Sequence, residues 1–215
     1  MPAPGRLMLE THSYSPHLRR FMRAVGANPG LVVDFGVDAS SIVVEVGAYL
    51  GDWTERMSRS SGARIYAFEP NPAVLPRMRN RFADQPNVVI LEYGLGPRDE
   101  DAVLSRNGPG SSLTRLSPYE SVTVPIRDIA VAFGDLGLEH IDVLHMNIEG
   151  GEYDALEHLA EKGWFPRIGV FVVQFHEWIP KAHRRRRALQ RELRRTHTKL
   201  WDYPWVFEAW QVSAG

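Results

Sequence analysis

Short β-branched apolar runs alternate with helix-forming segments along most of the chain, and this alternation restricts the fold more than any other feature. The run 42-IVVEV-46 is typical of a strand that is covered on both faces of a parallel sheet. Comparable runs recur at 64–69, 88–93, 141–150 and 168–175. Strands that alternate with helices predict an α/β fold, a three-layer αβα sandwich around a mainly parallel sheet.

The segments between these runs carry local helix signals. Ser15 can cap the first helix and Gly26 can end it, whereas Pro76 leaves the start of the third helix open. The predicted helices cover residues 15–26, 52–60, 70–82, 128–137, 152–163 and about 179–196. Residues 94–120 are rich in Gly, Pro and Ser and are predicted to be mostly loop with short strands, followed by an extended piece at 121–126. Two extended pieces around Pro204 would form a closing hairpin and make the last strand antiparallel.

Length and composition are those of an ordinary globular protein. The chain has 215 residues, no cysteine, 44% hydrophobic residues and a formal net charge of −1, which suits a single domain over 1–215 with residues 1–30 as a helical N-terminal extension. No apolar run approaches the roughly 20 residues that span a bilayer, and the N-terminus lacks a signal-peptide pattern. We therefore expect a cytoplasmic protein without a membrane partner. We find no convincing cluster of metal ligands.

The first strand is followed by Gly47 and Gly51, and it carries a carboxylate at Glu45. In an open parallel sheet, ligands bind beyond the carboxyl ends of the strands. A dinucleotide site requires G-x-G-x-x-G, but here the pattern is E-x-G-x-x-x-G with Tyr49 inside the turn, which disfavours a pyrophosphate and an NAD-dependent oxidoreductase. A nucleoside-type ligand fits this turn better.

The second strand ends at Glu69, which lies 22 positions after Gly47. An acidic residue at about this distance from a glycine turn commonly binds ribose, because a carboxylate can accept two hydrogen bonds from a vicinal diol. The alternative is that Glu69 only caps the following helix.

Four motifs resemble those of FkbM family methyltransferases, which have the class I methyltransferase fold: 45-EVGAYLGDWT-54, 67-AFEPNP-72, 110-GSSL-113 and 144-LHMNIEGGEYDALEHL-159. Their order and spacing hold from about residue 42 to 176. The resemblance implies a Rossmann-like, seven-stranded sheet with an antiparallel last strand. It also implies methyl transfer from S-adenosyl-L-methionine, usually O-methylation of a hydroxyl on a small natural product or sugar in secondary metabolism.

The resemblance also assigns cofactor-binding positions. Glu45 would face the cationic, amine-bearing end of the cofactor, and Gly47 and Gly51 would shape the turn that holds it. The other positions lie around the ribose, the adenine and the long loop; they are Glu69, Asn71, Tyr93, Gly94, Ser111 and Ser112.

Candidate catalytic residues follow the later strands. Glu149 and Asn147 lie at the C-terminal end of the run at 141–150 and would point toward the cofactor methyl, with Glu149 as a candidate base and Asn147 as an orienting group. His176 ends the next strand and is a second candidate base. Each of these residues also has a purely structural explanation. Glu149 and Glu152 would then be negative charges that favour the start of the following helix, and His176 would be bonded to a backbone carbonyl.

The chain departs from the family pattern at three positions. His145 and Asn147 stand where the family usually has Lys and Asp, and Gln174 stands where many relatives have Glu. The changes at His145 and Asn147 motivate one alternative function, a non-catalytic cofactor-binding protein.

Residues 181–199 carry nine Lys or Arg against one acid, Glu192. A solvated helix face is the expected explanation; attraction of a phosphorylated or sulfated acceptor and a homodimer contact are alternatives. We expect a small-molecule hydroxyl acceptor and no nucleic acid, with RNA binding or RNA modification through this basic stretch as the competing function.

Overall fold

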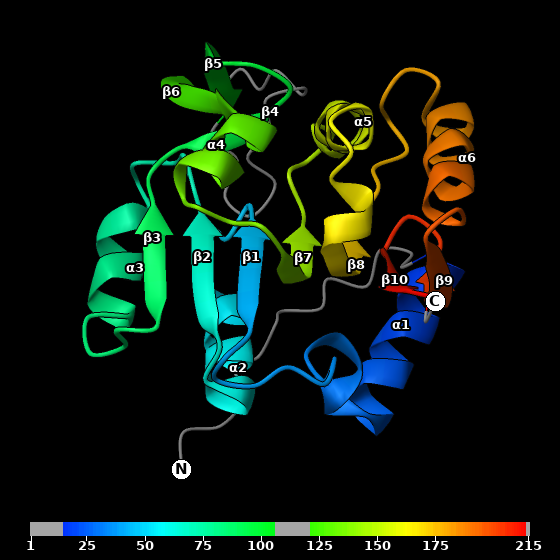
Figure 1. Ribbon diagram of the computed structural model, residues 1–215, viewed down its shortest axis with the longest axis horizontal. Helices are drawn as coiled ribbons and strands as arrows, with labels where there is room; N and C mark the ends of the chain where they lie inside the picture. Colours follow the sequence, from blue (N-terminus) through cyan, green and yellow to red (C-terminus); the bar gives the residue numbers. More distant parts are fainter. Residues whose placement is uncertain (1–14, 106–120, 214–215) are drawn as a thin grey trace.

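The centre of the protein is one seven-stranded sheet (Figure 1), seen in a computed structural model that describes residues 15–105 and 121–213. Across the sheet the strands follow the order β3 (Val88–Leu91), β2 (Arg64–Phe68), β1 (Ile42–Val46), β7 (Ile141–Met146), β8 (Ile168–Val173), β10 (Phe207–Val212) and β9 (His197–Tyr203). Strands β3, β2, β1, β7 and β8 pair in parallel, and β10 runs antiparallel to both β8 and β9. The predicted seven-stranded, mainly parallel sheet with an antiparallel last strand is confirmed.

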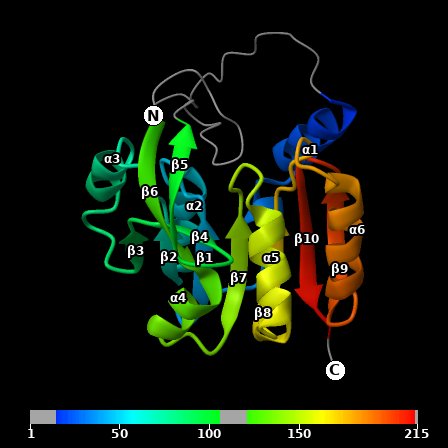
Figure 2. The same cartoon turned by 90° about the horizontal axis from the view of Figure 1, so that it is seen from above.

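Helices cover both faces of this sheet and complete the three layers (Figure 2). One face packs against α4 (Ile129–Asp135), α5 (Glu152–Glu161) and α6 (Ala182–Leu193) through buried residues such as Leu144, Leu156 and Leu189. The other face packs against α1 (Pro16–Ala27), the short 3₁₀ helix η1 (Pro29–Val32), α2 (Asp52–Ser61) and α3 (Leu75–Arg81). A second 3₁₀ turn, η3 (Phe165–Arg167), precedes β8. Within the described ranges, no helix is both long and apolar enough to cross a membrane.

Helix α3 begins at Leu75, well inside the segment 70–82 in which the sequence left its start open. Side chains of the preceding turn take the backbone donors that a helix would otherwise use. The Glu69 carboxylate accepts the N–H of Asn71, and the Asn71 side chain accepts the N–H of Ala73. This Asx turn holds residues 69–73 outside the helix and leaves Glu69 and Asn71 at the sheet edge.

A second, three-stranded sheet was not part of the sequence prediction. It contains β4 (Gly94–Gly96), β6 (Ser121–Asp128) and β5 (Glu100–Ser105) in that order, with β6 parallel to β4 and antiparallel to β5. Its apolar side chains, Leu104, Val124 and Ile126, form a small buried cluster. The sequence predicted short strands within 94–120 and an extended piece at 121–126, which β6 contains, but local patterns do not show which strands pair.

Candidate functional site

A cavity of about 390 Å³, here called the Glu69 cavity, opens beyond the carboxyl ends of β1, β2 and β7. The second sheet forms part of its wall. The lining includes six residues expected from the sequence to be functional: Gly47, Glu69, Asn71, Gly94, Asn147 and Glu149. The edge of a parallel sheet is where ligands bind in open α/β folds, and the volume is within the range of small-molecule sites.

Two backbone amides hold the Glu69 carboxylate in this wall. Oε2 accepts the N–H of Tyr49 at 2.7 Å, and Oε1 accepts the N–H of Asn71 at 2.8 Å. The side chain is buried, and this burial raises the pKa of Glu69. Glu69 does not cap α3, whose N-cap is Val74. Each carboxylate oxygen keeps acceptor capacity beyond its amide bond, so the group can receive two hydroxyls of a diol.

The glycines near the cavity are required by close approaches within the protein. Gly47 has φ of 85°, and a Cβ there would lie 2.1 Å from the backbone oxygen of Asn147. A Cβ on Gly94 would lie 2.5 Å from Cδ1 of Ile126. Gly47 therefore allows the turn after β1 to lie directly against the exit of β7, which narrows the bottom of the crevice.

Two other predicted cofactor positions, Gly51 and Tyr93, do not line either cavity. Gly51 has φ of 77°, and a Cβ there would lie 2.4 Å from Cε2 of Phe82, so packing between α2 and the end of α3 accounts for this glycine. The Tyr93 ring packs edge-on against Phe68, with the Arg127 guanidinium 5.0 Å from its centroid. Ser111 and Ser112 lie outside the described residues.

A second cavity of about 310 Å³, here called the His145 cavity, lies on the α1 and α2 side of the same crevice. Its walls are mainly apolar, and its polar groups include Glu45 and His145. The His145 ring stacks on Trp53 at 4.3 Å and on Phe207 at 5.5 Å. Gly47, Tyr49 and Asn147 line both cavities, so the two cavities are neighbours along the sheet edge.

Glu45 and His145 form a buried pair of titratable groups. Oε1 of Glu45 lies 3.7 Å from Nδ1 of His145, and the Thr54 hydroxyl donates to Oε2 of Glu45. Burial raises the pKa of Glu45 to about 8 and lowers the pKa of His145 to about 3, because both charged forms lose hydration. Both side chains are therefore largely neutral at pH 7. A cation entering the His145 cavity would favour the ionised form of Glu45.

Glu149, His176 and a third residue, Glu152, are brought together behind the Glu69 cavity. Oε1 of Glu149 lies 3.6 Å from Nε2 of His176. On the other side of the ring, Nδ1 of His176 lies 3.0 Å from Oε1 of Glu152. Glu149 has φ of 52°, a left-handed conformation that is costly outside glycine and is concentrated at functional sites.

The sequence interpretation of Glu152 as a simple helix-start charge missed this contact. Glu152 does lie in the first turn of α5, but its side chain is fully buried against the exit of β8. The spacing E-G-G-E, two acids three positions apart at a strand end, was the available signal. Asn147 adds a further unpaired group, because its Oδ1 is buried and makes no hydrogen bond within the described residues.

Within residues 15–105 and 121–213, no three His, Asp or Glu side chains are arranged to hold a metal ion.

Comparisons with known proteins agree with this architecture. A sequence model of the methyltransferase FkbM domain matches residues 45–196. The methyltransferase FkbM of Methylobacillus flagellatus KT superposes with a TM-score of 0.52 at 16% identity, covering 81% of this chain and 44% of that one. The fibrillarin pre-rRNA processing protein of Methanococcus jannaschii superposes with a TM-score of 0.50 at 11% identity, covering 81% and 67%. At these identities the structures show a shared fold.

A curated relative matches the sequence over a shorter stretch. The ribosomal RNA small subunit methyltransferase A of Thermotoga petrophila is 32% identical over 99 residues, which cover 46% of this chain and 35% of the relative. The match thus spans about a third of the length of that relative.

Proposed function

Because the chain belongs to the methyltransferase FkbM domain family, we propose that it transfers a methyl group from S-adenosyl-L-methionine to a hydroxyl oxygen of a small natural product or sugar. The observation that carries the proposal is the Glu69 carboxylate. It is fixed by two amides, lines a cavity at the sheet edge and keeps acceptor capacity for the two hydroxyls of a ribose.

The polar groups of the two neighbouring cavities suit the charges of this cofactor. Glu69 would hold the ribose hydroxyls, while Asn71 and Gly94 border the same cavity and would flank the nucleoside. The amine end would extend past Gly47 into the His145 cavity, where Glu45 can ionise to meet it. When bound, the cofactor supplies an electrophilic methyl group on a cationic sulfur.

The chain's own residues would position the acceptor and receive its proton. Glu149 lines the Glu69 cavity and lies within 3.6 Å of His176, so a hydroxyl that enters beside it meets a carboxylate backed by an imidazole. Asn147 presents a buried amide oxygen at the junction of the two cavities and would orient the reacting groups. A positioned base contributes about 10²–10⁴ in rate, and orientation contributes about 7–11 kcal/mol.

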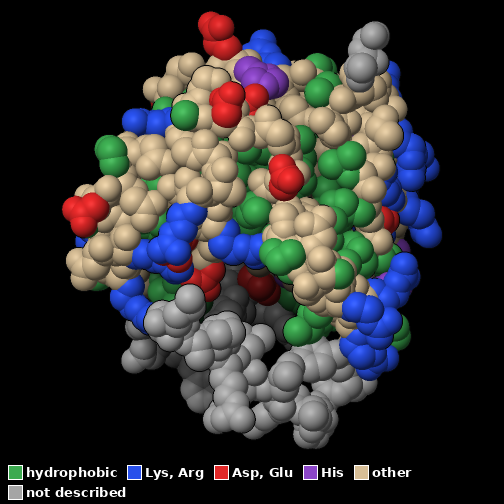
Figure 3. Space-filling model, turned by 90° about the horizontal axis from the view of Figure 1, so that it is seen from below, with side chains coloured by type: hydrophobic (Ala, Val, Ile, Leu, Met, Phe, Trp, Pro, Cys, Tyr) green, Lys and Arg blue, Asp and Glu red, His purple; other side chains and the backbone are tan. Residues whose placement is uncertain are grey.

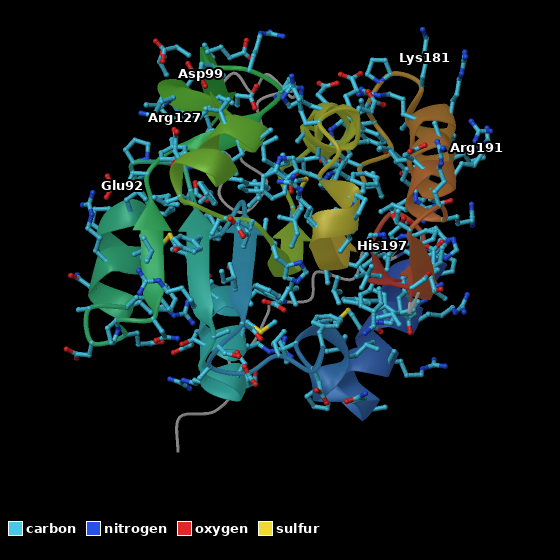
Figure 4. The ribbon with its side chains drawn as sticks, viewed as in Figure 1. Glu92, Asp99, Arg127, Lys181, Arg191 and His197 are labelled. Carbon is cyan, nitrogen blue, oxygen red and sulfur yellow. The ribbon has the colours of Figure 1, made fainter. Side chains whose placement is uncertain are left out.

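Cofactor binding can be tested with S-adenosylhomocysteine. At about 100 times its Kd, this ligand should stabilise the folded protein by roughly 2.7 kcal/mol, which differential scanning fluorimetry detects. Replacement of Glu69 by Ala should weaken binding in isothermal titration calorimetry at least about tenfold, because charge-assisted hydrogen bonds are worth about 1.5–3 kcal/mol each. Glu92→Ala is the matched control, since this carboxylate pairs with Arg79 and does not line the Glu69 cavity (Figure 4).

Two results would contradict the cofactor assignment. One is no shift in melting temperature at millimolar S-adenosylhomocysteine. The other is equal affinity in the Glu69→Ala and Glu92→Ala variants when both are folded, which would leave Glu69 with only the role of holding the turns after β1 and β2.

Methylation of RNA is the second candidate, favoured by the basic surface of α6 and the ribosomal RNA methyltransferases among the relatives. Arg185 and Arg186 are less available to bind RNA phosphates, because both make ion pairs within the fold. The exposed cations are Lys181, Arg184, Arg187, Arg191, Arg194 and Arg195. Lys181 and Arg191 project outward from α6 in Figure 4, and Figure 3 shows Lys and Arg side chains gathered along one edge of the molecule.

Acceptor class can be decided by measuring S-adenosylhomocysteine formation with a panel of sugars and hydroxylated natural products, and separately with ribosomal RNA. The proposal expects turnover with a hydroxylated small molecule. Turnover with RNA alone, with affinity falling steeply as salt rises, would replace it by the second candidate.

A further inference from the structure

Glu152 makes three hydrogen bonds although its side chain is completely buried. Its Oε1 accepts the backbone N–H of His176 at 2.8 Å and lies 3.0 Å from Nδ1 of the same residue. Its Oε2 accepts the N–H of Gly150 at 2.8 Å. One carboxylate thus joins the start of α5, the loop before it and the exit of β8.

These bonds determine which nitrogen of His176 carries the proton. Both oxygens of Glu152 already accept backbone N–H groups, so the side chain acts as an acceptor and Nδ1 is the donor toward it. In the neutral ring, Nε2 then carries the lone pair. Nε2 is buried, makes no hydrogen bond within the described residues and lies 3.6 Å from Oε1 of Glu149.

Other contacts hold the same ring in place. The Tyr153 hydroxyl donates to the backbone oxygen of His176 at 3.0 Å, and the Trp178 ring lies 4.4 Å from the imidazole. The backbone of His176 is therefore held from α5, and its ring packs against a side chain of its own loop. The charged side chains shown facing it are Glu149 and Glu152.

We propose that Glu152 is a positioning residue: it holds His176 in the Nδ1–H tautomer, so that Nε2 and the Glu149 carboxylate together receive the proton that leaves the acceptor hydroxyl. This inference rests on the proposed function. As the new oxygen–carbon bond forms, the electrons of the carbon–sulfur bond leave with sulfur. The hydroxyl proton passes to the Glu149 carboxylate, which lines the cavity, and from there to Nε2, giving an imidazolium between two carboxylates.

The tautomer can be measured without any acceptor. In protein labelled with ¹⁵N-histidine, long-range ¹H–¹⁵N spectra distinguish a protonated ring nitrogen from an unprotonated one, and His176→Asn identifies the resonances. At a pH at which the His176 ring is neutral, the wild type should show Nδ1 protonated and Nε2 unprotonated. Glu152→Gln should increase the Nε2–H population, because an amide NH₂ group at the Oε1 position donates to Nδ1 and leaves the ring proton on Nε2.

A matched variant on the same helix controls for general effects. Glu161 is exposed near the end of α5, and Glu161→Gln should leave the His176 resonances unchanged. A wild-type spectrum with Nε2 protonated would overturn the proposal, and so would an unchanged tautomer in a folded Glu152→Gln protein. If that variant does not fold, the wild-type spectrum alone still decides the tautomer.

The kinetic readout separates positioning from a purely structural role. With a hydroxyl acceptor that turns over, Glu152→Gln should lower kcat about 10²-fold or more while KM and S-adenosylhomocysteine affinity stay within about twofold. Unchanged kcat would refute the proton route. Absence of S-adenosylhomocysteine binding in the wild type would instead refute the proposed function, and the tautomer measurement would remain valid by itself.

Discussion

Replacement of Glu45 by Gln should change how the stability of this protein depends on pH. Glu45 is 2% exposed, and Gln keeps an oxygen that can accept the Thr54 hydroxyl but cannot ionise. The comparison therefore isolates one titrating group in a largely preserved environment. His145, its neighbour at 3.7 Å, is present in both proteins.

The direction follows from the two shifted pKa values. The folded-state pKa of Glu45 is about 8 against an ordinary 4.5, so its contribution to stability is fully present below pH 4.5 and is lost as pH rises toward 8. The folded-state pKa of His145 is about 3 against 6.5, so its contribution is fully present above pH 6.5 and is lost as pH falls toward 3. The two slopes oppose each other between pH 4.5 and 6.5, and above pH 6.5 only Glu45 acts.

The magnitude above pH 6.5 can be worked from these values. One pH unit corresponds to about 1.4 kcal/mol for one proton. Between pH 6.5 and 8 the free energy of unfolding of the wild type should therefore fall by about 2 kcal/mol relative to Glu45→Gln. For a chain of this size, that corresponds to about 4–8 °C in melting temperature.

Urea denaturation across this pH range measures the effect directly. Groups elsewhere titrate alike in the two proteins and cancel in the difference, and Glu161→Gln is the control for loss of an exposed carboxylate. Parallel stability curves for wild type and Glu45→Gln between pH 6.5 and 8 would show that Glu45 is not held neutral by burial.

Three further predictions concern packing, a buried ion pair and proton linkage. Gly47→Ala should destabilise the fold by more than about 3 kcal/mol, whereas Gly137→Ala, with a similar positive φ but open space, should cost only about 1–2 kcal/mol in thermal unfolding. Arg186→Met should cost about 3–5 kcal/mol because it leaves the buried Glu208 without its cation, while Arg191→Met on the same helix should stay within about 0.5 kcal/mol. Binding of S-adenosylhomocysteine at pH 7 should release up to about one proton, because the Glu45 carboxyl ionises when the ligand binds. Calorimetry in buffers of different ionisation enthalpy measures this proton release. Identical apparent binding enthalpies in all buffers would contradict the prediction.

Local sequence patterns determined the layers of the fold and the positions of Glu69 and Glu149 at the crevice. Apolar, β-branched runs predicted the strands, because a strand covered on both faces needs apolar side chains. The alternation then fixed a parallel sheet, and a parallel sheet gathers the residues that follow its strands at one edge. Glu69 and Glu149 could therefore be placed at the crevice from their positions alone.

Only the tertiary structure decided what these residues touch. Glu152 lies 24 positions from His176, and Glu45 lies 100 positions from His145; each pair meets because β7 lies between β1 and β8. The requirement for glycine at position 47 also depends on the tertiary structure, because a Cβ there would meet the backbone oxygen of Asn147. Propensity and periodicity depend on neighbours along the chain, whereas burial, pKa and tautomer depend on neighbours across the sheet.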